Sequence, residues 1–221
     1  MLTTMPSAIE RLLAISSPPL GSELDTSNST LPPSLAALLA ARNGFYAFES
    51  ALHVLPSGTD PTIMDVEKWN EPSLWRAAYA DAIPSDLVFF AEDIFGEQFG
   101  IEASSGVVRF APETATLTRE APDMESWAEH ILADYDVAPG WPIARAWQDR
   151  HGPLAAGQRL VPVIPFAAGG AFGLENIHAL PAAEGIRLRC DFSLQMRDVP
   201  PGTPMRIQIV NHPEGGPTSG L

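Results

Sequence analysis

The residues best placed to do chemistry are three carboxylates that lie close together in the sequence, Glu92, Asp93 and Glu97. Paired carboxylates can bind a metal ion or transfer protons. Because neighbouring residues of a strand point to opposite faces, Glu92 and Asp93 converge only if a turn intervenes. A metal-assisted hydrolase that uses these acids and a histidine brought near by the fold is one hypothesis. A solvated acidic turn is the simpler interpretation, and we favour it.

The sequence lacks the short motifs by which many catalytic and cofactor sites are recognised. It has no phosphate-binding loop with its lysine, and its glycines lack the dinucleotide-binding spacing. It has no nucleophile elbow, and its five histidines are scattered singly. The single cysteine, Cys190, alternates with apolar residues and is predicted to be a buried structural thiol. We therefore predict a protein that is not an enzyme and has no catalytic residue, cofactor or metal.

The three acids belong to a stretch, Asp86–Phe110, with the pattern of consecutive antiparallel strands. Its three apolar runs are Leu87–Ala91, Gln98–Ile101 and Val107–Phe110, and clusters of acidic, serine and glycine residues separate them. A meander of three strands needs a helix on one face to be stable. We expect the helical patterns on either side of this stretch to supply that cover.

Before the meander, Leu31–Asn43 is predicted to be a helix that ends at Asn43-Gly44. One or two strands follow over residues 45–55, and a short helix begins near Pro72, with Trp75 and Tyr79 packed in the core. After the meander, a strand is predicted over residues 115–118. Asp123 then caps a helix with apolar residues at helical spacing, all assigned to the core: Met124, Trp127, Ala128, Ile131, Leu132 and Tyr135.

Residues 138–221 form a second sub-region. The pattern predicts a helix over 142–150, an edge strand or extended coil over 158–165, and strands over 175–180 and 205–210. Residues 181–198 fit either a helix or a strand, because their apolar residues alternate strictly. We favour a helix, since Pro200-Pro201-Gly202 then turns the chain. The tail from about residue 212 is predicted to be frayed.

These elements predict an α+β fold, in which helices pack on a mostly antiparallel sheet of about six strands, with a C-terminal α/β extension. Residues 1–30 are an N-terminal helix and linker, 31–137 the main domain, and 138–221 an extension packed on the same domain. No apolar run is long enough for a membrane span, and the N-terminus has no basic signal-peptide region. With one cysteine, these features predict a cytoplasmic, reduced protein.

The net charge of −14 is concentrated in one part of the chain. Residues 44–140 contain eighteen acidic and four basic residues, whereas the segments on either side are nearly neutral. Such a surface repels nucleic acid and attracts basic proteins by long-range steering. The alternative is that the charge only keeps the protein soluble. Trp69, which has polar neighbours, is the best candidate for an exposed aromatic anchor.

A family resemblance points the same way. The helix before Asn43-Gly44, the segment Phe48–Leu52, the tryptophans Trp69 and Trp75, and Asp86–Phe99 resemble the SUKH superfamily of Smi/Knr-like domains. The likeness continues through Phe110–Thr114 and the helix with Trp127, and covers roughly residues 31–137. It implies an α+β fold and a non-enzymatic binding protein. Many bacterial members are immunity proteins that neutralise a cognate toxin, often a nuclease, and fungal members are scaffolds.

We therefore expect a basic protein partner, such as a cognate toxin, and no nucleic-acid or membrane partner. A housekeeping scaffold of the same fold is the first alternative, and the metal-assisted hydrolase is the second. The oligomeric state stays open. The residues predicted to contact the partner are Asp65, Glu67, Trp69, Glu92, Asp93, Glu97 and Glu102.

Overall fold

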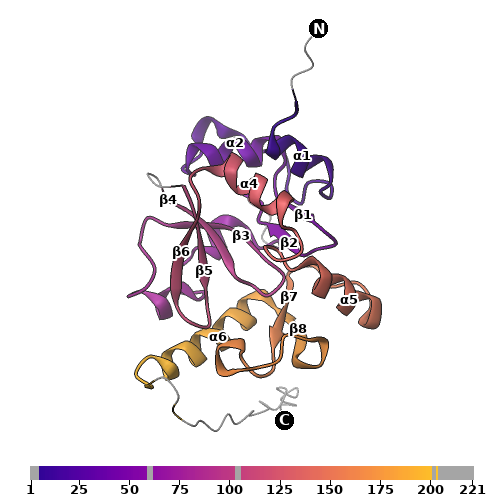
Figure 1. Cartoon of the computed structure of the whole chain (residues 1–221). Coiled ribbons are helices and arrows are strands. Elements are labelled where there is room, and N and C mark those ends of the chain that lie inside the picture. The colour runs from indigo at the N-terminus through magenta and orange to yellow at the C-terminus, as the bar shows by residue number, and fades with distance from the viewer. Residues whose placement is uncertain (1–4, 59–61, 103–105, 201–202, 204–221) are drawn as a thin grey trace, which may run out of the picture.

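The computed structural model describes residues 5–58, 62–102, 106–200 and 203 (Figure 1). It has the predicted α+β fold, with a six-stranded antiparallel sheet, helices packed on it and a second sheet of two strands. The α-helices are α1 (Ala8–Ala14), α2 (Pro33–Ala41), α3 (Val66–Trp69), α4 (Met124–Ala133), α5 (Trp141–His151) and α6 (Ala182–Met196). The 3-10 helices are η1 (Thr26–Asn28), η2 (Arg76–Tyr79), η3 (Phe166–Ala168) and η4 (Leu174–Asn176).

The strands of the main sheet follow one another in chain order, so the sheet is a simple meander. They are β1 (Phe45–Ala47), β2 (Leu52–Val54), β3 (Val88–Glu92), β4 (Gln98–Glu102), β5 (Gly106–Ala111) and β6 (Thr116–Ala121). The smaller sheet pairs β7 (Gln158–Pro162) with β8 (Ile177–Pro181). The three strands predicted over residues 86–110 are confirmed as β3, β4 and β5.

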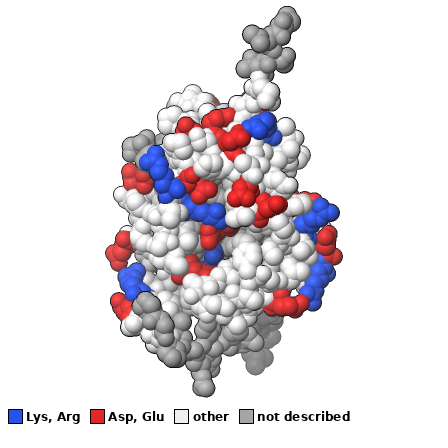
Figure 2. Space-filling model, viewed as in Figure 1, with Lys and Arg blue, Asp and Glu red and all other residues white. Residues whose placement is uncertain are grey.

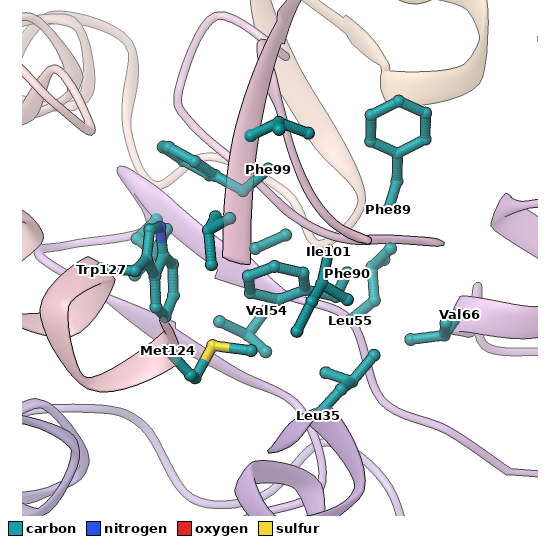
Figure 3. Close-up of a cluster of buried hydrophobic side chains, with 14 of the residues drawn as sticks. Leu35, Val54, Leu55, Val66, Phe89, Phe90, Phe99, Ile101, Met124 and Trp127 are labelled. Atoms are coloured by element: carbon teal, nitrogen blue, oxygen red, sulfur yellow. The ribbon is translucent and has the colours of Figure 1, made fainter. Parts of the chain in front are cut away.

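One face of the main sheet is covered by the helices α1, α2 and α4. Trp127 of α4 lies with its ring centroid 5.1 Å from that of Phe90 and 5.7 Å from that of Phe99 (Figure 3). Leu35 of α2 is also fully buried in this cluster. Burying each such side chain contributes roughly 1.5–3 kcal/mol to folding. Asp123 caps α4 by accepting a hydrogen bond from the Ser126 N–H, as predicted.

A second aromatic cluster covers the opposite face. Trp75 and Tyr79 pack against each other at 6.1 Å between ring centroids, and both contact Phe110. The prediction that this pair belongs to the core is confirmed. Cys190 is buried in the same core, as predicted. Cys190 belongs to α6, which spans Ala182–Met196. The helix that we favoured for this segment over a strand is therefore confirmed.

The C-terminal unit consists of α5, the β7–β8 sheet and α6. It has its own hydrophobic cluster, in which Leu160 and Ile177 pack with Ile94 and Phe95 from the turn between β3 and β4. The turn and the unit thus share one small core. The strand predicted over 205–210 and the tail from about 212 lie outside the described residues. Within the described ranges, no helix is both long and apolar enough to span a bilayer.

The prediction that Tyr135 lies on the core face of the fourth helix is wrong. That helix, α4, ends at Ala133, where the Asp134 N–H still bonds to the His130 carbonyl. Tyr135 therefore lies beyond the helix and is 39% exposed. The helical spacing of the apolar residues continues in the sequence to Tyr135, which lies two residues past the end of the helix.

Candidate functional site

The sheet register places His53, Glu92 and Gln98 next to one another across β2, β3 and β4. All three side chains are buried. His53 Nδ1 lies 2.9 Å from Glu92 Oε1, and the Gln98 amide donates to Glu92 Oε2 at 3.3 Å and to the Gly96 carbonyl at 2.9 Å. These three residues lie side by side at the end of the sheet that the C-terminal unit covers.

The cation that neutralises Glu92 is Arg159 of β7. Its Nε lies 3.0 Å from Glu92 Oε1, and both side chains are almost fully buried. Burial alone would raise the pKa of Glu92, but Arg159, His53 and Gln98 together lower it below its usual value. Burial lowers the pKa of His53, an effect that the hydrogen bond to Glu92 opposes. This pattern fits a neutral His53 that donates its Nδ1–H to an ionised Glu92.

Asp93 and Glu97 lie in the turn between β3 and β4 and share Arg109 of β5. The Arg109 Nη2 donates to Asp93 Oδ2 at 2.8 Å, and its Nε donates to Glu97 Oε2 at 2.6 Å. Asp93 Oδ1 also accepts from the N–H groups of Phe95 and Glu97, so the carboxylate shapes the turn. Burial raises the pKa of Asp93 to about 7, against the lowering effect of Arg109.

A second arginine of the C-terminal unit, Arg189 of α6, enters the same end of the sheet. It is buried, lies 3.4 Å from Glu113 Oε1 and donates to the Phe95 carbonyl. Glu113 also accepts from the Ala167 N–H at 2.9 Å. We refer to the buried ionisable residues where the sheet meets the C-terminal unit as the junction: His53, Glu92, Asp93, Glu113, Arg159 and Arg189.

The junction meets only part of what the hydrolase hypothesis requires. That hypothesis needs a histidine and two carboxylates in one pocket, whereas His53 meets one carboxylate, Glu92. In the part of the chain that the structure describes, no group of three or more His, Cys, Asp or Glu residues is arranged to hold a metal ion. A surface groove of about 410 Å³ is lined by residues of α1, α2 and α4 and by the caps Ser7 and Asp123, and it includes none of the predicted site residues.

The predicted contact residues do not form one exposed surface. The prediction that Trp69 is an exposed anchor is wrong, because it is 1% exposed and its indole N–H donates to Gln98 Oε1 at 2.7 Å. Asp65 is buried, where it caps α3 and pairs with Lys68. The expected exposure of Glu92 and Asp93 is also wrong. The other three stay nearer the surface: Glu67 is exposed, and Glu97 and Glu102 are half-buried.

Apart from Glu67, the exposed acids of this segment lie outside the predicted contact residues. Among the described residues of 44–140, ten acidic side chains are exposed, against a single exposed basic one, Arg119. Figure 2 shows acidic side chains spread over one face, with basic ones between them. The exposed acids are Glu49, Glu67, Glu71, Asp81, Asp86, Asp123, Glu125, Glu129, Asp134 and Asp136.

Sequence reasoning missed a partly exposed aromatic cluster whose sequence neighbours include three of these acids, Glu49, Asp134 and Asp136. The ring of Tyr135 stacks on Phe48 at 5.5 Å and meets Trp141 edge-on at 5.5 Å. We call Phe48, Tyr135 and Trp141 the aromatic ladder. The signal in the sequence was Asp134-Tyr135-Asp136-Val137, in which acidic and apolar residues alternate directly after a helix. Such alternation outside a strand leaves apolar side chains near the surface.

Comparison with known proteins gives a fold and no family. No family model and no curated protein matches this chain. Among solved structures, the crystal structure of Atu4351 from Agrobacterium tumefaciens is similar, with a TM-score of 0.52 and 13% sequence identity. The match covers 82% of this chain and 87% of that one, so it reaches past residue 137 into the C-terminal unit. At this identity the likeness shows that the two chains share a fold.

Proposed function

We propose that this chain is a non-enzymatic protein-binding module that holds a basic partner on its acidic surface, as an immunity protein holds a cognate toxin. The observation that carries the proposal is the division of the acids. Those of the junction are neutralised by arginines of the same chain, and the exposed ones are matched by few basic side chains. An excess of exposed charge of one sign speeds association with a partner of the opposite sign.

The chemistry of a nuclease toxin would suit such a surface. A nuclease binds a polyanion, and it therefore presents a basic surface to its substrate. An acidic protein that covers this surface blocks access of the nucleic acid. The resemblance to the SUKH superfamily supports this reading, since many bacterial members are immunity proteins. A housekeeping scaffold of the same fold would bind its partner through the same charges but would not protect the cell against a toxin.

The test is capture of the partner followed by rescue. The immobilised full-length chain is exposed to a lysate of its source organism and eluted with a salt gradient. We expect a basic protein to elute as salt rises, to arrest growth when expressed alone, and to be harmless when this chain is co-expressed. A captured protein that is harmless alone would favour the scaffold. Capture that salt does not weaken, or the absence of rescue, would contradict the proposal.

A further inference from the structure

The turn between β1 and β2 has an unusual backbone. Phe48, Glu49 and Ser50 have φ values of 53°, 54° and 71°, which lie in the left-handed region that non-glycine residues rarely occupy. Two side chains of the C-terminal unit hold this turn. Gln148 donates to the Glu49 carbonyl at 2.7 Å, and Arg159 donates to the Ser50 carbonyl at 3.4 Å. A strained conformation that its surroundings maintain is often part of a functional surface.

The strained turn positions one end of the aromatic ladder. It places Phe48 parallel to Tyr135, with 3° between the ring planes, while the Glu49 side chain is exposed. At the other end, the guanidinium of Arg145 lies over Trp141 at 5.5 Å from the ring centroid. The chain thus already binds one arginine on an aromatic face of this cluster by a cation–π contact.

Exposed apolar surface and unneutralised acids occur together around Tyr135. Tyr135 is 39% exposed, and Val137, two residues further, is 71% exposed. Glu49, Asp134 and Asp136 are exposed, and across the described ranges none of the three forms a salt bridge. Aromatic side chains are enriched at interface centres, and acidic side chains beside them would attract a cationic residue of a partner.

We propose that the aromatic ladder and its three acids form the docking surface for an arginine-bearing loop of the basic partner. The arginine lies against Tyr135 and is neutralised by Asp134 and Asp136, while Val137 contacts the aliphatic part of the loop. This inference rests on the proposed function, because it names the surface by which that partner is held. It extends the proposal by assigning affinity to the ladder and association rate to the remaining acids.

The direct test uses a defined probe instead of the partner. The ¹⁵N-labelled full chain is titrated with the peptide acetyl-Gly-Arg-Gly-Arg-Gly-amide, and NMR shifts of backbone amides and of the Trp141 indole are followed. We expect saturable shifts at residues 48–50 and 134–141 that weaken with salt. A peptide with glutamate in place of arginine should cause none. Shifts spread evenly over all the exposed acids, or no shifts, would overturn the inference.

Variants separate the ladder from general acidity. Tyr135→Ala should weaken peptide binding about two- to fivefold, as expected for loss of an exposed cation–π contact. The Asp134→Asn, Asp136→Asn double variant keeps the aromatic rings, so it tests the surface even if Tyr135→Ala perturbs the fold. The matched control is Glu71→Gln, Asp86→Asn, which removes the same charge from exposed positions outside the ladder. Equal weakening by both double variants would overturn the inference.

The captured partner distinguishes failure of this inference from failure of the proposed function. If the partner binds the Tyr135→Ala and Asp134→Asn, Asp136→Asn variants with unchanged affinity and salt dependence, the ladder is not the docking surface, although the function stands. If no partner is captured but the peptide maps to the ladder, the toxin-binding function fails, whereas the site itself is retained.

Discussion

The acids of the junction and those beside the aromatic ladder carry the same chemical group but lie in opposite environments, one buried and the other exposed. Glu92 is buried against Arg159 and His53, whereas Asp134 and Asp136 are exposed beside Tyr135. In the junction, acids and arginines are paired inside the molecule, and these pairs attach the C-terminal unit to the sheet. At the ladder, charge is left to solvent and is available to another molecule. In our proposal, the same residue type therefore serves stability in one region and recognition in the other.

The contrast between the two regions requires that the junction acids support the fold, and Glu92→Ala tests this with the largest expected effect. The variant leaves Arg159 and His53 buried without their carboxylate. Removal of one partner from a buried ion pair costs about 3–5 kcal/mol of unfolding free energy. Urea denaturation should show this loss.

Its control is Glu71→Ala, which truncates an exposed glutamate and should change stability by less than about 0.5 kcal/mol. Similar, small losses in both variants would mean that the junction charges are as well solvated as those on the surface. The distinction between the two regions would then disappear.

The pH dependence of stability tests the protonation state of the junction. Because burial lowers the pKa of His53 in the folded state, the unfolded state takes up the proton first as the pH falls below about 6.5. This contribution to stability is present above that pH and is lost on acidification. The raised pKa of Asp93 acts in the opposite direction between about 4 and 7.

The variant His53→Asn isolates the histidine, because Asp93 is the same in both proteins and an asparagine amide can still donate to Glu92. Urea denaturation between pH 5.5 and 7.5 should show a smaller loss of stability on acidification for the variant than for the wild type. Parallel pH profiles would show that His53 is not held in its neutral form.

The local patterns that built the sheet and its helices could be read from the sequence, while the pairing of the charges could not. Apolar runs such as Leu87–Ala91 are bounded by turn residues, and this determines strands without reference to the rest of the chain. Glu92 and its cation Arg159 come from strands far apart in sequence. The residues next to Glu92 in the sequence do not indicate that its carboxylate is buried against an arginine.

Trp69 illustrates the same limit. Its neighbours Lys68 and Asn70 are polar, and this suggested exposure. The helix α3 is only one turn long, however, and Trp69 lies on its buried side. The polarity of its sequence neighbours therefore does not indicate where the ring lies. The acceptor for its indole N–H, Gln98, lies on β4. The sequence contains one sign of a buried ion pair, which is an arginine within an apolar run, Arg159-Leu160-Val161.

The strained turn links the two regions, since Arg159 of the junction holds the backbone that presents Glu49 at the ladder. Glu49→Gly should stabilise the protein by up to about 1 kcal/mol, because glycine adopts a left-handed φ without the usual steric penalty. The opposite sign is expected for Glu184→Gly in the first turn of α6, where glycine weakens a helix. Thermal unfolding of both variants measures the difference. A loss of stability in Glu49→Gly would show that the turn is not strained.

The smallest effect on stability is expected at the ladder, where an effect on binding should stand apart from any effect on the fold. Asp136→Asn removes one charge at an exposed position, so the free energy of unfolding should change by less than about 0.5 kcal/mol. Binding of the arginine peptide should nevertheless weaken and become less sensitive to salt, since one of the acids that attract it is gone. Glu92→Gln, a matched loss of one carboxylate, should give the reverse pattern, with a marked loss of stability. A variant at Asp136 that lost stability without losing peptide affinity would place this acid with the junction instead.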